Sequence, residues 1–547
     1  MLYTAQFFGI LMAESQATEK KAPAVFVRDS TGLVKNVSFL DTIALNFSNM
    51  SVGPLLTTVA GSAVATMVLV NVSGLNLVMA SMIAFVLAIP QMVVYTMMSR
   101  RYPRAGGDYV WLSRTFGGFT GSTLSFWGYT METLAFIALV AILLDYAIGG
   151  VGATMGFGYG FPTTSWTTLF SAGFWQFAVG AVAFSVVIGL NIVKPKAGYK
   201  FVTILSVFGA LTLLIAMAVL LGGGHSSLVN YANCTGAYNG TNCLGLNGTS
   251  SFNTVAATYQ PSGMPFDLNF GNMIYIMPVM FAFVYPWLNA APAVASEIKG
   301  KRALKWNVPL SAVISFAFLT SIFAVMYSVG GMPFINGVFH DSAYQSTLGV
   351  NFFSLAMGVA NNAILAWVIG LGWIALQFAV IAYAVIVFSR YLLAQSMDRF
   401  LPSRLSYVSS KFGSPMIAHA VDWIVTVALI GITAYYFGSI SGIFGAIIAS
   451  MIYFMFVGLA AVVQAIRKES GVSKGILALA GALNIVVFGF IAYQFLAAPG
   501  FTGLNDVTAI YSIGTLIVGA VIYLASSSYH KRKGMDISLN YKELPPE

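Results

Sequence analysis

The stretch MPVMFAFVYPWLNAAPAVASEIKGKR, residues 277–302, decides the fold. Its apolar part continues a run long enough for a membrane-spanning helix, and it ends in a basic cluster, yet Pro286 and Pro292 lie inside it. Proline lacks an amide donor and clashes with the preceding turn, at a cost of about 3 kcal/mol in a helix interior. Lipid offers no water to the freed backbone groups, so such a break must be buried in protein or line a cavity.

The composition indicates an integral membrane protein. Of 547 residues, 58% are hydrophobic and 8% are charged, whereas about 25% charged residues are usual in a soluble domain. Twelve apolar stretches reach the ~20 residues that a helix needs to cross a bilayer. They cover roughly residues 40–70, 75–98, 119–148, 171–190, 199–222, 271–296, 307–331, 355–394, 417–437, 440–465, 475–497 and 507–528. The first residues lack the basic region and cleavage site of a signal peptide.

The Lys and Arg residues test this count, because connecting loops keep positive charge on the cytoplasmic side. All 26 occur in the N-terminal arm, in the connections after spans 2, 4, 6, 8 and 10, and in the C-terminal tail. This pattern predicts twelve helices with both termini cytoplasmic: an arm over residues 1–38 and a flexible tail over residues 529–547. Topology thus explains the net charge of +9, which argues against nucleic-acid binding.

The long connection over residues 223–270 lies on the outer side in this topology. It carries both cysteines of the chain, Cys234 and Cys243, and an oxidising exterior favours a disulfide between them. Two free thiols are the alternative. Glycosylation sequons in the same connection make candidates of Asn233, Asn239 and Asn247, and their occupancy depends on the host.

A second apolar stretch is interrupted in a similar way, five spans earlier. Residues 46–56, NFSNMSVGPLL, place Gly53 and Pro54 beside polar residues near the middle of the first predicted span. Interrupted segments at corresponding positions of two halves are typical of secondary transporters built from inverted repeats. Such breaks free amide and carbonyl groups which, with the half-helix dipoles, bind a carboxylate or a cation. The alternative is a plain kink that neighbouring side chains satisfy.

Three motifs resemble the amino acid–polyamine–organocation transporter superfamily, and specifically its amino acid permeases. SRRYPRAGGDYVWLSRTFGGFTGSTLSFWGY, residues 99–129, is similar to the family's PraGGsY signature and the Arg-Phe-Gly turn after it. NAAPAVASEIKGKR, residues 289–302, resembles the end of the family's span 6. SRYLLAQSMDRFLPSRLSYVSSKFGSPMIA, residues 389–418, resembles the segment after span 8. The resemblance therefore covers both halves of the chain.

The resemblance implies an all-α membrane fold of twelve helices. Spans 1–5 and 6–10 would form two inverted five-helix repeats, over residues 39–222 and 271–466, and spans 11 and 12 follow over residues 467–528. Spans 1 and 6 are the broken ones in this family. The substrate binds between them, and access alternates as a helix bundle moves against a scaffold.

The resemblance also assigns the substrate site. The candidate substrate-binding residues are Asn49, Ser51, Val52, Gly53, Phe283, Val284, Tyr285, Pro286 and Trp287. Amides around residues 51–53 are expected to bind a carboxylate. Two departures from the family pattern leave the substrate open: Gly53 is all that remains of a glycine-rich break, and Trp287 stands where a glycine is usual. Its indole either shrinks the pocket or stacks on a cationic or aromatic substrate.

Glu132 is the acidic residue deepest in a predicted span, and intramembrane ionisable residues are functional candidates. With every Lys and Arg placed in a connection, it has no basic partner, which makes it a candidate proton-coupling group. A permanently protonated carboxyl bonded to a Tyr or Ser is the alternative. Residues 373–388 contain no Ser or Thr, which argues against the sodium site of related folds. Uncoupled uniport or exchange stays open.

The four histidines, at positions 225, 340, 419 and 530, are not grouped at metal-ligand spacing, and we expect them on the surface. No enzyme active-site or phosphate-loop motif occurs. The sequence therefore predicts a plasma-membrane transporter for amino acids or related organic amines that is not an enzyme, without cofactor, metal or nucleic-acid partner. A non-transporting nutrient sensor of the same fold is the alternative from another class.

Overall fold

The computed structural model describes residues 32–58, 75–234, 252–258, 270–340, 350–437 and 445–545. Within these ranges the chain is helical, and its strand-like pairings are two isolated bridges, Val37 with Ile298 and Ala105 with Val294. Both bridges hold a connecting segment against the end of the interrupted stretch that contains Pro286 and Pro292.

Ten helical segments of the described chain are long and apolar enough to cross a membrane. They are α5 (Leu77–Arg101); α7 (Gly118–Ser125) continued by η1 (Phe126–Met131) and α8 (Glu132–Tyr159); α10 (Gly173–Val193); α11 (Pro195–Asn233); α16 (Lys301–Gly330); α20 (Ala363–Met397); α21 (Met416–Ile432) with η4 (Thr433–Phe437); η5 (Gly445–Ile447) with α23 (Ile448–Lys468); α24 (Gly471–Ala497); and α26 (Asp506–Arg532). Shorter helices between them are α6 (Asp108–Phe116), α9 (Trp166–Ser171), α12 (Phe252–Thr258), α17 (Met332–His340), η3 (Ser403–Ser406) and α25 (Pro499–Thr502).

These ten segments match ten of the twelve predicted spans, and the other two are interrupted as expected. The described part of the first consists of α2 (Phe39–Asn49) and α3 (Val52–Thr58). The second consists of α13 (Phe270–Tyr275), α14 (Met277–Met280), α15 (Ala290–Ala293) and η2 (Ala295–Glu297). The predicted span over residues 355–394 is also divided, because α19 (Phe352–Val359) forms a helix of its own before α20. The protein is therefore an all-helical, multi-pass membrane protein.

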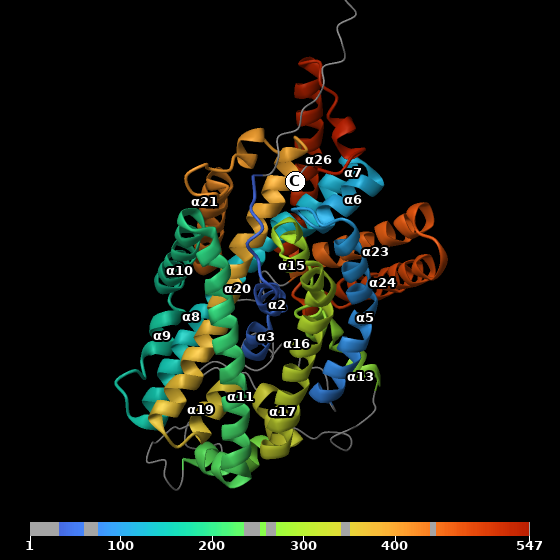
Figure 1. Ribbon diagram of the computed structural model, residues 1–547. Helices are drawn as coiled ribbons and strands as arrows, with labels where there is room; N and C mark the ends of the chain where they lie inside the picture. The colour runs from blue at the N-terminus through green and yellow to red at the C-terminus, as the bar shows by residue number, and fades with distance from the viewer. Residues whose placement is uncertain are drawn as a thin grey trace, which may run out of the picture.

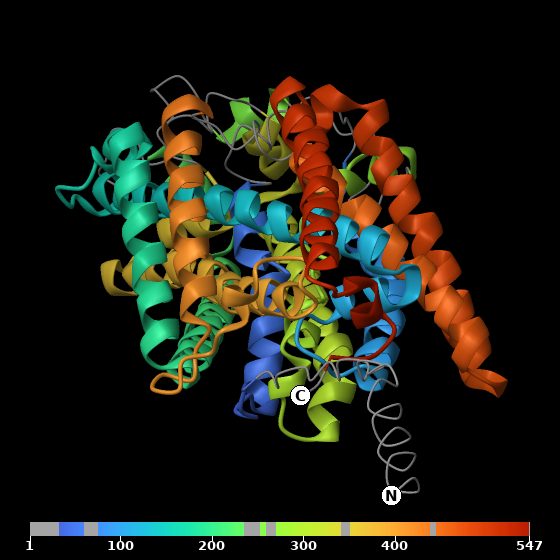
Figure 2. The same cartoon turned by 90° about the horizontal axis from the view of Figure 1, so that it is seen from above.

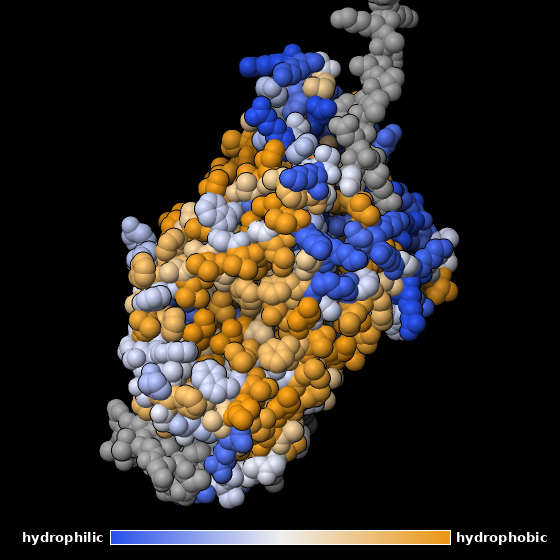
Figure 3. Space-filling view, turned by 60° about the vertical axis from the view of Figure 1, so that its left-hand side comes forward, coloured by the Kyte–Doolittle hydropathy of each residue, from blue (hydrophilic) through white to orange (hydrophobic). Residues whose placement is uncertain are grey.

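The interrupted segments lie inside the helix assembly. α2 packs against α11, α15, α16 and α20, and α3 packs against α8, α16, α19 and α20. Figure 1 shows α2 and α3 in blue between α11, α16 and α20, and Figure 2 shows them near the middle of the molecule from above. The outer surface is largely apolar: in Figure 3 an apolar band crosses the visible face, and hydrophilic residues gather above it. We call the end of the molecule that carries α6, η3 and the C-terminal segment the basic end.

The C-terminal tail is packed rather than flexible, so that expectation was wrong. After α26 the chain forms η6 (Ile537–Tyr541) against the basic end (Figure 1). Asn540 Nδ2 donates to the carbonyl of Asp398 at 3.1 Å, and Ser122 Oγ donates to Tyr541 Oη at 3.1 Å. Arg114 Nε donates to the carbonyl of Glu543 at 3.0 Å. A short polar tail gave no sequence signal of these partners, because they come from distant parts of the chain.

A pair of glycines seats the turn before α6 directly on α15. The amide of Gly106 donates to the carbonyl of Ala293 at 2.9 Å. Gly107 has φ +45°, and a Cβ atom built on it would lie 3.0 Å from backbone atoms of Pro292 and Ala293. The glycines of the sequence RAGGD are therefore needed for close approach and for a backbone conformation that other residues rarely adopt.

We expect Gly107→Ala to destabilise the protein by about 2–4 kcal/mol, because strain at positive φ adds to a backbone clash. Gly117→Ala is the matched control: Gly117 has φ +82° but nothing within 4 Å of an added Cβ, so only the conformational cost applies. Thermal unfolding of both purified variants in detergent measures the difference. Equal losses of melting temperature would show that the contact with α15 contributes nothing.

Candidate functional site

The first break lies between α2 and α3, at Met50 and Ser51. Ser51 has φ +53°, a left-handed conformation that is uncommon for a residue other than glycine. Its hydroxyl donates to the carbonyl of Asn49 at 3.0 Å, which satisfies an acceptor that the end of α2 leaves free. Pro54 falls in the first turn of α3, where a missing amide costs little. The sequence therefore ends one helix and starts another at this point.

Gly53 allows a close approach of α20 to this break. A Cβ atom at this position would lie 2.6 Å from the Cβ atom of Leu376, so a larger residue would push α20 away. One turn further on, the hydroxyl of Thr57 accepts hydrogen bonds from Trp373 Nε1 and Gln377 Nε2, each at 2.8 Å. The start of α3 is thus fixed to α20 by packing and by polar contacts.

Neighbouring side chains satisfy part of the second break. Gln91 Nε2 on α5 donates to the carbonyl of Pro286 at 2.8 Å. The amide of Ala291, at the start of the next helical turn, donates to Asn46 Oδ1 on α2 at 2.9 Å. These contacts explain how an apolar span can contain two prolines. The side chains of α2 and α5 bind the backbone groups that water would bind outside a membrane.

A direct hydrogen bond joins the two breaks. Asn49 Nδ2, at the end of α2, donates to Asn289 Oδ1, at the start of α15, at 3.0 Å. Both side chains are fully buried. Asn49 was among the predicted site residues, whereas Asn289 was not, because nothing in the sequence indicates which polar residue of the second break faces the first.

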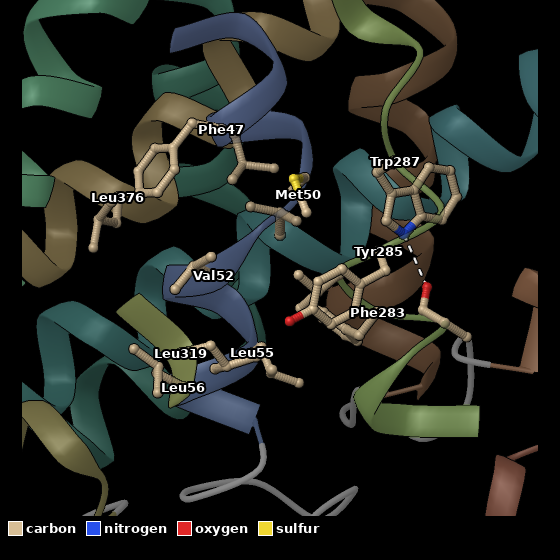
Figure 4. Close-up of a cluster of buried hydrophobic side chains, with 14 of the residues drawn as sticks. Phe47, Met50, Val52, Leu55, Leu56, Phe283, Tyr285, Trp287, Leu319 and Leu376 are labelled. Atoms are coloured by element: carbon tan, nitrogen blue, oxygen red, sulfur yellow. Dashed lines mark hydrogen bonds between the residues drawn. The ribbon is translucent and has the colours of Figure 1, made fainter. Parts of the chain in front are cut away.

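Figure 4 shows the apolar side chains packed around the breaks. Val52 and Leu55 from α3 lie opposite Phe283 and Tyr285 from the second break. Trp287 Nε1 donates to the carbonyl of Ala282 at 2.9 Å (Figure 4), so its indole is held by its own segment.

The Trp287 ring lies within an aromatic cluster and closes the site. It stacks on Phe136 with ring centres 5.6 Å apart, and Phe454 meets it edge-on at 5.7 Å. All nine predicted site residues are buried. In this conformation none of these residues is exposed to solvent.

Polar atoms near the breaks that are buried without a hydrogen-bond partner among the described residues include Asn49 Oδ1, Gln91 Oε1 and Gln377 Oε1. Buried polar atoms are nearly always hydrogen-bonded, so each such exception needs an explanation. A small polar ligand between the breaks would supply these partners.

Glu132 lies outside this group. It begins α8 directly after the π-helix η1, it is 2% exposed, and its Oε2 has no hydrogen-bond partner among the described residues. π-Helical turns occur frequently at functional sites. Within the described chain its carboxylate forms no hydrogen bond with either break, so it is a separate candidate.

One expectation about charge was wrong. Arg390 lies inside α20, a candidate span, and is 1% exposed, whereas every Lys and Arg was expected in a connection. Its Nε donates to Glu297 Oε1 at 2.8 Å, and Tyr199 Oη donates to Glu297 Oε2 at 2.9 Å. Glu297 closes the second interrupted segment, and its backbone accepts from the amide of Val37 at 3.0 Å. The basic end of this segment is therefore fixed by a buried ion pair.

Other predictions fall at the edges of the site or outside the described residues. His419 is fully buried, not exposed, because α21 turns it toward the interior. Asn233 ends α11, where its Oδ1 accepts from the amide of Phe252 at 2.7 Å. Cys243, Asn239 and Asn247 lie outside the described residues, so the disulfide with Cys234 and the glycosylation of this connection stay predictions.

Comparison with known proteins identifies the family of this chain. The sequence profile of the amino acid permease family matches residues 37–522, which include both breaks and all ten candidate spans up to most of α26. The chain belongs to the amino acid permease family. It is thus a transporter of amino acids and not an enzyme. Among curated protein sequences none matches this permease significantly.

We expect single replacements in the buried ion pair of the permease to be costly. Glu297→Gln and Arg390→Met should each lower the free energy of unfolding by about 3–5 kcal/mol, because each leaves one buried charge without its partner. The double variant Glu297→Leu with Arg390→Met should lose less than the sum of the two, and thermal unfolding in detergent measures all three. Additive losses would contradict a coupled pair.

Proposed function

We propose that this permease is a secondary transporter of the plasma membrane that takes up amino acids or related organic amines by alternating access. The proposal includes twelve membrane crossings, ten by the long helices and two by the interrupted segments, arranged as two inverted five-helix repeats. The basic end would face the cytoplasm together with both termini. The direct bond between Asn49 at the end of α2 and Asn289 at the start of α15, which joins the two breaks, carries this proposal.

The substrate would bind between the two breaks. The amides of Val52 and Gly53 would bind its carboxylate, because the first amides of a helix have no acceptor within it and its dipole favours an anion there. The amide of Ser51 already donates to the carbonyl of Ser48 at 3.0 Å. The side of the site formed by residues 283–287 would contact the rest of the substrate. The unpartnered amide oxygens of Asn49, Gln91 and Gln377 support a polar ligand in this place.

The aromatic cluster sets the size of the substrate in this proposal. Trp287 and Phe136 fill the space beside the second break, and the indole nitrogen is already bonded to Ala282. Phe136 covers one face of the indole, so the other face would meet an apolar side chain or the cation of an organic amine. This favours small or flat substrates over long branched ones.

Replacement of Trp287 by Ala should therefore change the substrate preference. We expect uptake of amino acids with bulky side chains to rise relative to small ones by about 10–200-fold in kcat/KM, the range typical of hydrophobic pockets. Competition against a radiolabelled mixture of the protein amino acids in proteoliposomes measures this ratio. Phe456→Ala is the control, since Phe456 packs on α23 away from the breaks, against Phe116. An unchanged ratio in Trp287→Ala would place the substrate elsewhere.

Glu132 would couple transport to a proton gradient. It is buried, it forms no ion pair within the described chain, and it lies next to the π-helical turn of the same span. A carboxyl group in such a place can take up a proton in one conformation and release it in another.

We expect an inward proton gradient to stimulate uptake into proteoliposomes, and Glu132→Gln to reduce uptake to the level without a gradient. Asp145→Asn is the matched control: Asp145 is also a buried carboxylate of α8 without a hydrogen-bond partner among the described residues, but it lies several turns away. An equal loss of gradient-stimulated uptake in both variants would contradict a special role of Glu132. Thermal stabilisation by amino acids without any uptake would instead indicate a sensor of the same fold.

A further inference from the structure

A buried carboxylate at the basic end is not used by the proposed transport scheme. Asp108 begins α6 directly after the glycine pair that seats this turn on α15, and it is fully buried. The PRAGGDYVW stretch, residues 103–111, carries an acidic residue where the related motif has a small one. Isolated buried carboxylates are costly unless they are hydrogen-bonded, paired or protonated. The partners of Asp108 therefore decide what it does.

These partners are tyrosines. Tyr95 Oη on α5 donates to Asp108 Oδ2 at 2.5 Å, and Tyr391 Oη on α20 donates to Asp108 Oδ1. Tyr129 in η1 and Tyr453 on α23 also face the carboxylate. The side chain thus lies in a cage of four phenol rings from four different elements.

No charge neutralises Asp108 in the part of the chain that the structure describes. Arg390, on the same helix as Tyr391, is engaged by Glu297, and Arg114, on α6 itself, is paired with Asp398. The remaining neighbour on α6, Tyr109, donates its hydroxyl to Asp398 at 2.7 Å, and α15 contributes the uncharged Asn289. Burial raises the pKa of the Asp108 carboxyl to about 6, although the bonds from Tyr391 and Tyr95 act to lower it.

Asp108 ends a chain of hydrogen bonds that starts at the two breaks. Asn49 Nδ2 donates to Asn289 Oδ1 at 3.0 Å, Asn289 Nδ2 donates to Tyr391 Oη at 3.1 Å, and Tyr391 Oη donates to Asp108. Every donor in this chain points toward the carboxylate. An ionised carboxylate only accepts hydrogen bonds, so it fixes this direction, whereas a protonated one carries a donor of its own. Charge at Asp108 therefore strengthens each bond back to the breaks.

We propose that Asp108 is a proton-binding site that controls the basic end of the two broken spans. When it is ionised, the chain of bonds holds α2, α15, α20 and α6 together. When it takes up a proton, one of its oxygens becomes a donor, and the carboxyl accepts the hydrogen bond from Tyr391 less strongly. The segment that contains α15 and η2 is then released from α20 and α6. The role in transport rests on the proposed function, but proton binding and release of the segment do not.

Infrared spectroscopy tests proton binding directly. Difference spectra of the purified protein between about pH 5 and about pH 8, on either side of the pKa of about 6, should contain the carbonyl band of a protonated carboxyl group. We expect Asp108→Asn to lose one component of this band and Glu132→Gln to keep that component. A band of unchanged intensity and shape in Asp108→Asn would overturn the proposal.

Hydrogen exchange tests the release of the segment. The amides of Ala291, Ala293 and Gly106, corrected for intrinsic rates, should exchange about tenfold faster at the lower pH, since bonds to a charged acceptor are the stronger ones. Tyr391→Phe breaks the chain and should exchange fast at both values. Tyr95→Phe removes a donor to Asp108 outside the chain and should keep the dependence on pH. The same result for the two tyrosine variants would overturn the proposed chain, even if Asp108→Asn fails to fold.

Transport assays separate this proposal from the proposed function. These assays use proteoliposomes with equal pH on both sides and a radiolabelled mixture of the protein amino acids. The rate of exchange should depend on pH with a midpoint near 6 in the wild type, and this dependence should be absent in Asp108→Asn. Absence of uptake in every variant would refute the transport function while the infrared and exchange results still decide on Asp108. A midpoint that is unchanged in Asp108→Asn would contradict the role of Asp108 in transport.

Discussion

The structure depends on one constraint: backbone groups that a break frees inside an apolar assembly must find partners in the protein. Two interrupted segments meet this constraint together. Asn46 and Gln91 supply partners for the second break, and the hydroxyl of Ser51 supplies one for the first. Since most of these partners come from other helices, the two breaks are stable only when α2, α3, α5 and α20 are packed around them. The two helix interruptions are thus stabilised by contacts with other helices.

The same logic governs the charged groups. A charge removed from water needs a partner, and the protein meets this need in two ways. Glu297 receives a full ion pair from Arg390, which holds the end of the second broken segment. Asp108 receives phenol hydroxyls only, which can satisfy both its ionised and its protonated form. A paired charge suits a fixed support, whereas a carboxylate held by neutral donors suits a group that changes its protonation state.

In the proposed alternating-access cycle the permease opens toward one side and closes toward the other, so it needs contacts that form and break within the cycle. The described conformation is closed around the breaks, and its contacts at the basic end are dense: Val37 pairs with the end of the second segment, and the C-terminal segment packs over α6 and α7. Two buried carboxylates, Glu132 and Asp108, lie on different elements, α8 and α6. This separation offers one group for the proposed coupling and another for the closure of the basic end.

Much of the fold and part of the site follow from the sequence alone. Long apolar runs determined the ten long helices, because only helices satisfy their own backbone in lipid, and prolines with glycine determined where two segments break. The match to the family profile likewise depends on the sequence alone. The sequence did not determine that Asn289 meets Asn49, that Arg390 is buried against Glu297, or that Asp108 is enclosed by tyrosines. The contacts of Asn49 with Asn289, of Arg390 with Glu297 and of Tyr391 with Asp108 join residues 93 to 283 positions apart. Only tertiary packing brings them together, since the spacing of residues along a helix fixes its faces but not which distant polar group each face meets.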